Sequence, residues 1–334
     1  MCVRQGDDGR KQVWLSGWLW YTHTQSTREK IMPAAAECHP DPLRIAAYST
    51  CPSGLWHERI APLLAAPEMV MFNVGADKGF NLLEFMQRYS SVASNLTHRD
   101  WYSRVMEYGC QAQCCGVCGV CKSSRITQQA TSNVQLHAFE LQPANVQLLQ
   151  RIVASMNLPV TVHSTAVSNT TGITYTAASV KAGSESFGIV RTPNPRYTQR
   201  PVTTIDAFMR AEGIPRVHFV SIDTEGEDPL VLKGMQGALS ARSIDVVEFE
   251  YNRKWKAVLR SARPMKPIID WMYGMGYVCF WQGNKGALAQ LSGSCYREET
   301  RNRFGFARSN AVCTHRADII QVFRSCQRKP FCQN

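Results

Sequence analysis

The chain has 334 residues, 44% of them hydrophobic, and a formal net charge of +11 at pH 7. A chain of this length and composition can bury a core, which excludes a wholly disordered protein. No apolar run reaches the roughly 18 residues that a membrane helix needs, so we expect no transmembrane span.

The first part of the chain shows no regular pattern. Residues 1–60 mix polar residues with scattered Trp and Pro, and we interpret them as an N-terminal extension. The Trp-rich stretch from Val13 to Tyr21 is apolar but too short to cross a bilayer. Regular patterning follows, so we take residues 61–290 as the main domain.

Strands and helices alternate within this domain. The expected strands cover residues 69–74, 134–140, 160–163, 217–222, 244–249 and 277–281. The expected helices cover residues 81–89, 143–156, 205–212, 229–239 and 266–275. This alternation predicts an α/β fold with a doubly wound, mainly parallel, Rossmann-like sheet.

A polar, cysteine-rich insertion over residues 91–130 interrupts the alternation. Five cysteines fall together in it: Cys110, Cys114, Cys115, Cys118 and Cys121. The C-x2-C spacing predicts a structural zinc site made by Cys110, Cys114, Cys118 and Cys121. The alternative is a pair of disulfides with one spare thiol, in an oxidising compartment. In either form we expect the cysteines to lie away from the acidic end of the fourth strand.

The positive charge is concentrated at the other end of the chain. Residues 252–334 contain 15 Lys and Arg but only four Asp and Glu, which accounts for the whole net charge. We interpret residues 291–334 as a basic C-terminal extension. The asymmetry predicts contact with an anionic partner, and a basic face that only confers solubility is the alternative.

In a doubly wound sheet, ligands bind at the carboxyl ends of the strands. The turn over residues 75–79 has G-x-x-x-G spacing, with Gly75 allowing a sharp turn and Gly79 opening a helix. It lacks the G-x-G-x-x-G spacing of a dinucleotide site, which disfavours an NAD-dependent oxidoreductase. Glu140 ends the second strand, where a carboxylate can accept the hydroxyls of a ribose. Asp223 follows the fourth strand.

Each of these features has a simpler structural alternative. The glycines also suit an ordinary tight turn between a strand and a helix. Glu140 also suits the start of a helix, where acids are favoured. Asp223 also suits a cap for the helix that follows it.

Six segments, taken in order, resemble the FkbM family of methyltransferases. They are FNVGADKG (72–79), HAFELQPANVQLL (137–149), HSTAVSNTTG (163–172), PVTTIDAF (201–208), SIDTEGEDPLVLKGM (221–235) and VVEFE (246–250). The resemblance covers roughly residues 69–282. It implies a fold of class I methyltransferase type, S-adenosylmethionine as cofactor, and methyl transfer to a hydroxyl of a sugar or small metabolite. The acceptor would be a small molecule or a glycan.

The resemblance also assigns roles to residues. It implies that the cofactor is bound by residues of the turn and of two later segments: Asn73, Gly75, Ala76, Asp77, Gly79, Glu140 and Ala166. Asp223 and Glu225 match the acidic turn of the family. Asp223 lies where an acid after the fourth strand could face the acceptor, so we predict that Asp223 and Glu225 are catalytic. Asp223 would be a general base, or it would hold a divalent cation with Glu225 and Glu250.

Three positions depart from the pattern of the family. It more often has Asp at position 73, Asn at position 77 and Lys at position 221, where this chain has Asn73, Asp77 and Ser221. These departures favour a second hypothesis, a non-catalytic binding protein with a methyltransferase fold.

Overall fold

The computed structural model describes residues 54–283, 286–296 and 308–328, except 94, 117, 123–131, 179 and 186, together with Cys38 and two N-terminal strands. These strands, β1 (Val3–Gln5) and β2 (Lys11–Val13), form an antiparallel pair within the unit Met1–Ala35. Residues 14–21 of the Trp-rich stretch lie outside the described residues. Within the described part of the chain, no helix is long and apolar enough to cross a membrane.

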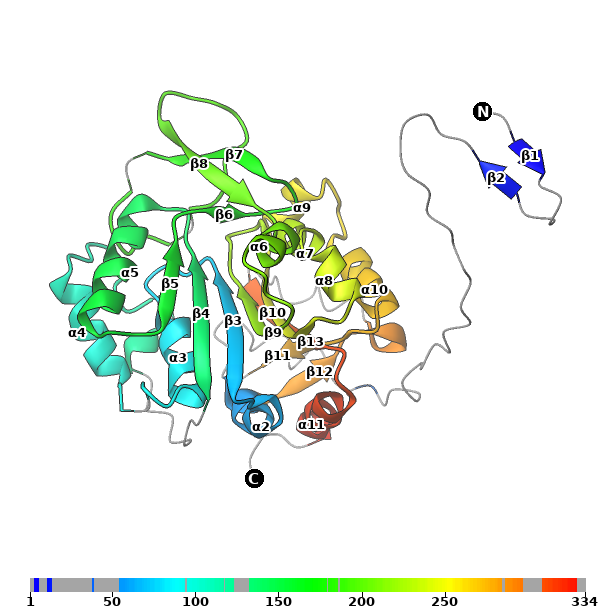
Figure 1. Ribbon diagram of the computed structural model, residues 1–334, viewed down its shortest axis with the longest axis horizontal. Helices are drawn as coiled ribbons and strands as arrows, with labels where there is room; N and C mark the ends of the chain where they lie inside the picture. The colour runs from blue at the N-terminus through cyan, green and yellow to red at the C-terminus, as the bar shows by residue number, and fades with distance from the viewer. Residues whose placement is uncertain are drawn as a thin grey trace. The chain divides into compact units, whose positions relative to one another are not determined.

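An eight-stranded sheet is the centre of the second unit, Ala36–Asn334 (Figure 1). Its strands are β3 (Glu68–Val74), β4 (Asn133–Phe139), β5 (Val160–His163), β9 (Val217–Ile222), β10 (Ile244–Asn252), β11 (Val278–Gln282), β12 (Leu288–Gln290) and β13 (Arg308–Thr314). They lie in the order β12-β11-β13-β10-β9-β3-β4-β5. The run from β5 to β10 is parallel, whereas β13 is antiparallel to both of its neighbours. This confirms the predicted doubly wound, mainly parallel sheet.

The winding of the sheet changes direction at β3. The chain first passes from β3 to β4 and β5 on one side, and later fills the other side with β9 and β10. Asn73 and Val74 of β3 lie in register with Ser221 and Ile222 of β9, so the carboxyl ends of these two strands meet. Such a switch point is where an open α/β sheet forms its ligand-binding crevice.

Helices cover both faces of the sheet. They are α2 (Leu55–Leu64), α3 (Phe80–Tyr89), α4 (His98–Glu107), α5 (Pro143–Ser155), α6 (Ile205–Ala211), α7 (Asp228–Lys233), α8 (Gln236–Ser240), α9 (Trp255–Val258), α10 (Met265–Gly274) and α11 (Ala317–Arg328), with short 3-10 turns η1 (Val120–Lys122) and η3 (Gly293–Cys295). Because side chains alternate along a strand, Met71 packs into one apolar cluster and Phe72 into the other. The first cluster includes α2, α3 and α11, and the second includes α6, α7 and α10.

A second, three-stranded sheet has the order β6-β8-β7 (Figure 1). Its strands are β6 (Ala166–Val167), β7 (Gly172–Ala177) and β8 (Tyr197–Thr203). β6 is parallel to β8, and β7 is antiparallel to it. It begins just after β5, so Ala166 enters the region that follows the carboxyl ends of the main strands.

Both predicted boundaries of the domain differ from the structure. β13 is inserted between β10 and β11, and Phe323 of α11 is buried against Trp56 of α2. Residues 308–328 therefore belong to the domain and not to a C-terminal extension that begins at residue 291. At the other end, Trp56 is already fully buried, so the domain begins before residue 61. Local sequence patterns missed both because these elements pair with distant parts of the chain.

Candidate functional site

A cavity of about 330 Å³ lies at the carboxyl ends of the central strands. On one side it is lined by residues that follow β3, β4 and β5, here called the loop end: Gly75, Ala76, Asp77, Gly79, Glu140, Gln142 and Ala166. On the other side it is lined by residues of α2, α3, β10 and β11, here called the aromatic end: Trp56, His57, Phe85, Glu248 and Gln282. Asp223, which follows β9, lies between these sides in the strand order.

The glycine turn is held between the two neighbouring strands. Gly75 has φ +82°, and a Cβ there would lie 1.8 Å from the carbonyl oxygen of Asp223. The amides of Gly75 and Ala76 both donate to the carbonyl oxygen of Phe139, at 2.9 and 3.1 Å. Gly79 also has a positive φ and caps α3. Only glycine fits at position 75, so the turn is fixed more tightly than an ordinary strand-to-helix connection requires.

Glu140 is fixed by backbone amides at the wall of the loop end. Its Oε2 accepts from the amide of Asp77 at 2.8 Å, and its Oε1 accepts from the amide of Gln142 at 2.7 Å. Burial raises the pKa of this carboxyl, whereas the amides of Gln142 and Asp77 lower it. The two carboxylate oxygens have four lone pairs together and three backbone amides interact with them, those of Gln142, Asp77 and Leu141, so at least one lone pair remains for a ligand.

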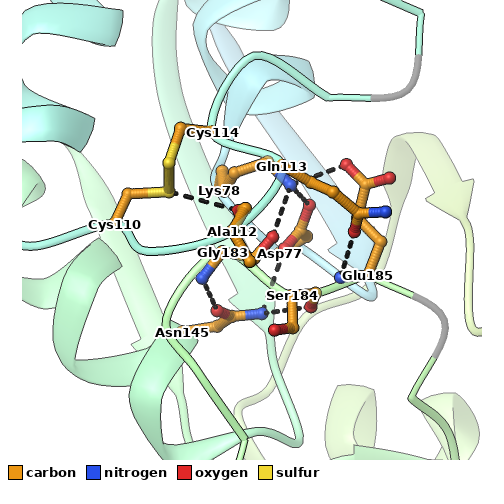
Figure 2. The surroundings of a disulfide bond; sticks show 10 residues. All are labelled: Asp77, Lys78, Cys110, Ala112, Gln113, Cys114, Asn145, Gly183, Ser184 and Glu185. Carbon is orange, nitrogen blue, oxygen red and sulfur yellow. Dashed lines mark hydrogen bonds and ion pairs between the residues drawn. A yellow bond between two sulfur atoms is a disulfide. The ribbon is translucent and has the colours of Figure 1, made fainter.

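Asp77 is turned toward a buried lysine (Figure 2). Lys78 is only 1% exposed, and its Nζ lies 2.5 Å from Asp77 Oδ2 and 2.6 Å from Glu185 Oε1. Asn145 donates to the other oxygen, Asp77 Oδ1, at 3.0 Å. Burial raises the pKa of Asp77 to about 7, although Lys78 lowers it. Lys78, Asn145 and Glu185 were not predicted from the sequence; for Lys78, the available signal was a lysine inside a glycine turn.

Two further residues assigned to the cofactor have different positions. Ala166 and its neighbour Val167 line the cavity with apolar groups. Asn73 is fully buried within β3 and is not among the lining residues, so the structure does not bring it to the cavity.

The carboxylates of the acidic turn after β9 differ in their contacts. Asp228 accepts from the amides of Thr224 and Gly226, at 3.4 and 3.1 Å, so Asp228 caps this turn. Burial, followed by the charge of Asp223, raises the pKa of Asp228 to about 8. Asp223 lines the cavity and is solvent-exposed. Glu225 also lines it, with an ion pair of 2.8 Å to Lys254.

The cation hypothesis for these acids finds no support in the geometry. Among the described residues, no three His, Cys, Asp or Glu side chains are grouped so that they would hold a metal ion. Asp223, Glu225 and Glu250 line one cavity but do not form such a group.

The aromatic end contains a hydrogen-bonded relay of side chains. Trp56 Nε1 donates to Gln282 Oε1 at 3.1 Å, and Gln282 Nε2 donates to Glu248 Oε1 at 2.7 Å. Burial raises the pKa of Glu248 to about 7, and the charge of Glu84 adds to the effect. The ring of His57 stacks on Trp56 with centroids 4.4 Å apart. Sequence analysis missed Glu248, for which the signal was an acid in the middle of an apolar strand.

The cysteines of the insertion form disulfides and no zinc site. Cys110 is bonded to Cys114, and Cys115 to Cys121. Cys118 is also disulfide-bonded, so the spare thiol of the disulfide hypothesis is not found among these five cysteines. The zinc prediction for Cys110, Cys114, Cys118 and Cys121 is therefore wrong, because zinc is bound by thiolates and a disulfide sulfur carries no such charge.

The position of the insertion also differs from the prediction. Gly116, Cys118 and Val120 line the same cavity as Asp223. The insertion is therefore part of the wall of the site and does not lie apart from the acids that follow the fourth predicted strand.

The strand order, the glycine turn after β3 and the acid after β4 define a methyltransferase domain of class I type. Residues 118–279 match the family model described as methyltransferase FkbM domain. Over these residues the chain matches the FkbM methyltransferase domain, which confirms the resemblance found in the sequence.

Three solved structures are similar to this chain. Methyltransferase FkbM from Methylobacillus flagellatus KT is 13% identical with a TM-score of 0.39, over 74% of this chain and 44% of that one. The METTL16 MTase domain is 9% identical with a TM-score of 0.35, over 78% and 64%. The human methyltransferase 10 domain containing protein is 8% identical with a TM-score of 0.27, over 82% and 81%. The chain thus spans less than half of the first of these structures. No curated protein matches the sequence.

Proposed function

We propose that the protein transfers a methyl group from S-adenosylmethionine to a hydroxyl of a sugar or small metabolite. The observation that carries this proposal is Glu140, whose carboxylate accepts from the backbone amides of Asp77 and Gln142. It lies beside the turn at Gly75, a position where only glycine fits. A fixed carboxylate next to closely approaching backbone is what a ribose and its attached chain require.

The loop end offers suitable groups for each part of such a cofactor. Glu140 would accept from the ribose hydroxyls, and Ala166 and Val167 would border the adenine. Gly75 and Ala76 would let the rest of the molecule approach the backbone, since neither has a bulky side chain. When bound there, S-adenosylmethionine supplies the electrophilic methyl group.

The chain's own residues would then align the acceptor and remove its proton. Asp223 lies between the two ends of the cavity and would accept the hydroxyl proton. The aromatic end would hold the acceptor, because the Trp56 ring offers an apolar surface and Glu248 and Gln282 offer polar contacts beside it. Such alignment is the main demand of an in-line methyl transfer.

A non-catalytic binding protein is the second candidate function. The departures at positions 73, 77 and 221 favour it, as does the engagement of the Asp77 carboxylate by Lys78 and Asn145. In this case the cavity would bind the cofactor without turning it over.

Two measurements separate these candidates. Calorimetry with S-adenosylhomocysteine tests for the binding site, and release of S-adenosylhomocysteine in a screen of hydroxylated acceptors tests for catalysis. Binding with turnover supports the methyltransferase, and binding without turnover on any acceptor supports the second candidate. Absence of binding would contradict both.

We also propose that the basic C-terminal region contacts an anionic partner. Its support is the excess of Lys and Arg over residues 252–334. Among these residues, 284–285, 297–307 and 329–334 lie outside the described part of the chain. Binding to anionic ligands that weakens as salt is added would be the expected result.

A further inference from the structure

We propose that the disulfide-bonded segment over residues 110–122, here called the cysteine segment, is a working part of the cofactor site. It holds the loop over residues 181–185 against Asp77 and Lys78, and so fixes the glycine turn in the form that binds the cofactor. This inference rests on the proposed function, because it assumes that the loop end binds S-adenosylmethionine.

The cysteine segment is bonded to the 181–185 loop through backbone and side-chain groups. The amides of Gln111 and Ala112 both donate to the carbonyl oxygen of Ala182, at 2.9 and 3.3 Å. The amide of Glu185 donates to Gln113 Oε1 at 3.0 Å. The loop is therefore held near both of its ends.

Between these bonds, the two segments are in direct contact at Gly183. This residue has φ +85°, and a Cβ there would lie 2.3 Å from Cys110 Sγ and 2.4 Å from the carbonyl oxygen of Ala112. Neither neighbour can move easily, because one is a backbone atom and the other belongs to the Cys110–Cys114 disulfide. Only glycine allows this approach.

The 181–185 loop in turn holds the glycine turn (Figure 2). Lys78 Nζ donates to the carbonyl oxygen of Gly183 at 3.1 Å and pairs with Glu185. Asn145 joins the same groups, since it accepts from the amide of Gly183 at 2.8 Å and donates to Asp77.

The contact with Asp77 leads on to Glu140, the residue proposed to bind the ribose. Asp77, which Lys78 and Asn145 hold by its side chain, donates its amide to Glu140. A buried lysine that loses a carboxylate partner is strongly unfavourable. Loss of the loop's position would therefore disturb Lys78 and, through Asp77, the orientation of Glu140.

The cysteine segment needs its disulfides to make these contacts. Within its described residues, the only regular element is the short turn η1. A segment with so little secondary structure pays a large entropy cost when it is ordered, and a covalent link lowers that cost. Cys110 is anchored in the core, 9% exposed, and its disulfide ties Cys114 to that anchor.

The first experiment removes this disulfide and measures the dissociation constant of S-adenosylhomocysteine by calorimetry. In Cys110→Ser/Cys114→Ser, we expect the constant to rise about ten- to hundredfold, the scale of a lost charge-assisted hydrogen bond. The matched control is Cys38→Ser/Cys295→Ser, which removes a disulfide whose cysteines do not line the cavity.

The control separates a local effect from a loss of stability. The Cys38–Cys295 bond links residues 257 positions apart, against four positions for Cys110–Cys114. In the chain-entropy model the longer loop stabilises the fold more. We therefore expect the control to lower the melting temperature more, but to leave the affinity for S-adenosylhomocysteine within about twofold of the unchanged protein.

The second experiment disturbs the same contact without touching a cysteine. In Gly183→Ala, the new methyl group collides with Cys110 and Ala112, and we expect a similar loss of affinity. Its control is Gly213→Ala, which also places a side chain at a positive φ, +64°, but meets no atom within 4 Å. Equal effects of these two variants would contradict the proposal.

The failure of this inference is distinguishable from that of the proposed function. If the unchanged protein does not bind S-adenosylhomocysteine, the proposed function fails. If it binds, and Cys110→Ser/Cys114→Ser and Gly183→Ala bind equally well, the cysteine segment has no part in the site and this inference is overturned.

Discussion

The loop end and the aromatic end of the cavity hold their polar groups in different ways. At the loop end, backbone atoms do the positioning: the glycine turn bonds to a strand carbonyl, and Glu140 is fixed by two amides. At the aromatic end, side chains position one another, from Trp56 through Gln282 to Glu248. Backbone amides and carbonyls are present whatever the side chains are, which suits the single cofactor proposed for the loop end. Side chains offer more varied shapes and polar groups, which suits the acceptor proposed for the aromatic end.

The largest effect is expected at Asp223, between the two ends. In Asp223→Asn, turnover should fall by about 10²–10⁴-fold, the size typical of a lost general base. Affinity for S-adenosylhomocysteine should change little, because the loop end is intact. Steady-state rates with an acceptor from the screen, together with calorimetry, measure both quantities.

Glu225→Gln is the control for this variant. Glu225 lines the same cavity but is paired with Lys254, so its loss should affect turnover less. Near-normal turnover in Asp223→Asn would show that Asp223 is not the general base.

A smaller effect is expected at the loop end itself. Glu140→Ala should weaken S-adenosylmethionine binding by about 1–3 kcal/mol, since it removes charge-assisted hydrogen bonds to the ribose. Calorimetry measures the change. Glu248→Ala is the control, because it removes a carboxylate from the aromatic end only. If both variants lost affinity equally, the division of the cavity into two ends would be wrong.

The smallest effect is expected on stability, at the aromatic end. The folded-state pKa of Glu248, about 7, lies above its ordinary value of 4.5, chiefly through burial; Glu84 raises it, whereas Gln282 and Arg88 lower it. The folded state therefore holds this proton more tightly, and the free energy of unfolding falls as pH rises between these two values.

Glu248→Gln cannot lose this proton. Relative to the unchanged protein, it should gain about 1–2 kcal/mol of stability when the pH is raised from about 4.5 to about 8, less than the full shift because the cavity is open to solvent. Urea unfolding at both pH values measures this difference. Asp77 and Asp228 titrate in both proteins and cancel. A constant difference between the two proteins would show that folding does not raise the pKa of Glu248.

Local patterns predicted much of the loop end. Glycine spacing located the turn at Gly75 and Gly79, and the acid at the end of an apolar strand identified Glu140. Both lie on the cavity wall. These predictions succeeded because a strand, a tight turn and the next helix are close in sequence, so their residues must also be close in space.

The same patterns did not predict the aromatic end. Trp56 and Gln282 are 226 positions apart along the chain and meet only because the fold brings the start of α2 to the end of β11. The family resemblance placed Asn73 at the cofactor, yet it is buried within the sheet. Alternation along a strand shows that two faces exist, but only packing decides which face borders a cavity.

The sequence by itself determined the alternating α/β elements, the glycine turn and the acids that follow the strands, because each of these is encoded by residues a few positions apart. Only the tertiary structure decided that β13 lies inside the sheet and that the cysteines pair as disulfides. Cysteine spacing is compatible with both zinc and disulfides, and the sequence of a strand does not show which other strands it pairs with. The place of β13 depends on which distant strands packing brings beside it. The cysteines of the insertion are neighbours in sequence, and only the folded geometry decides whether they bond to one another or to a metal.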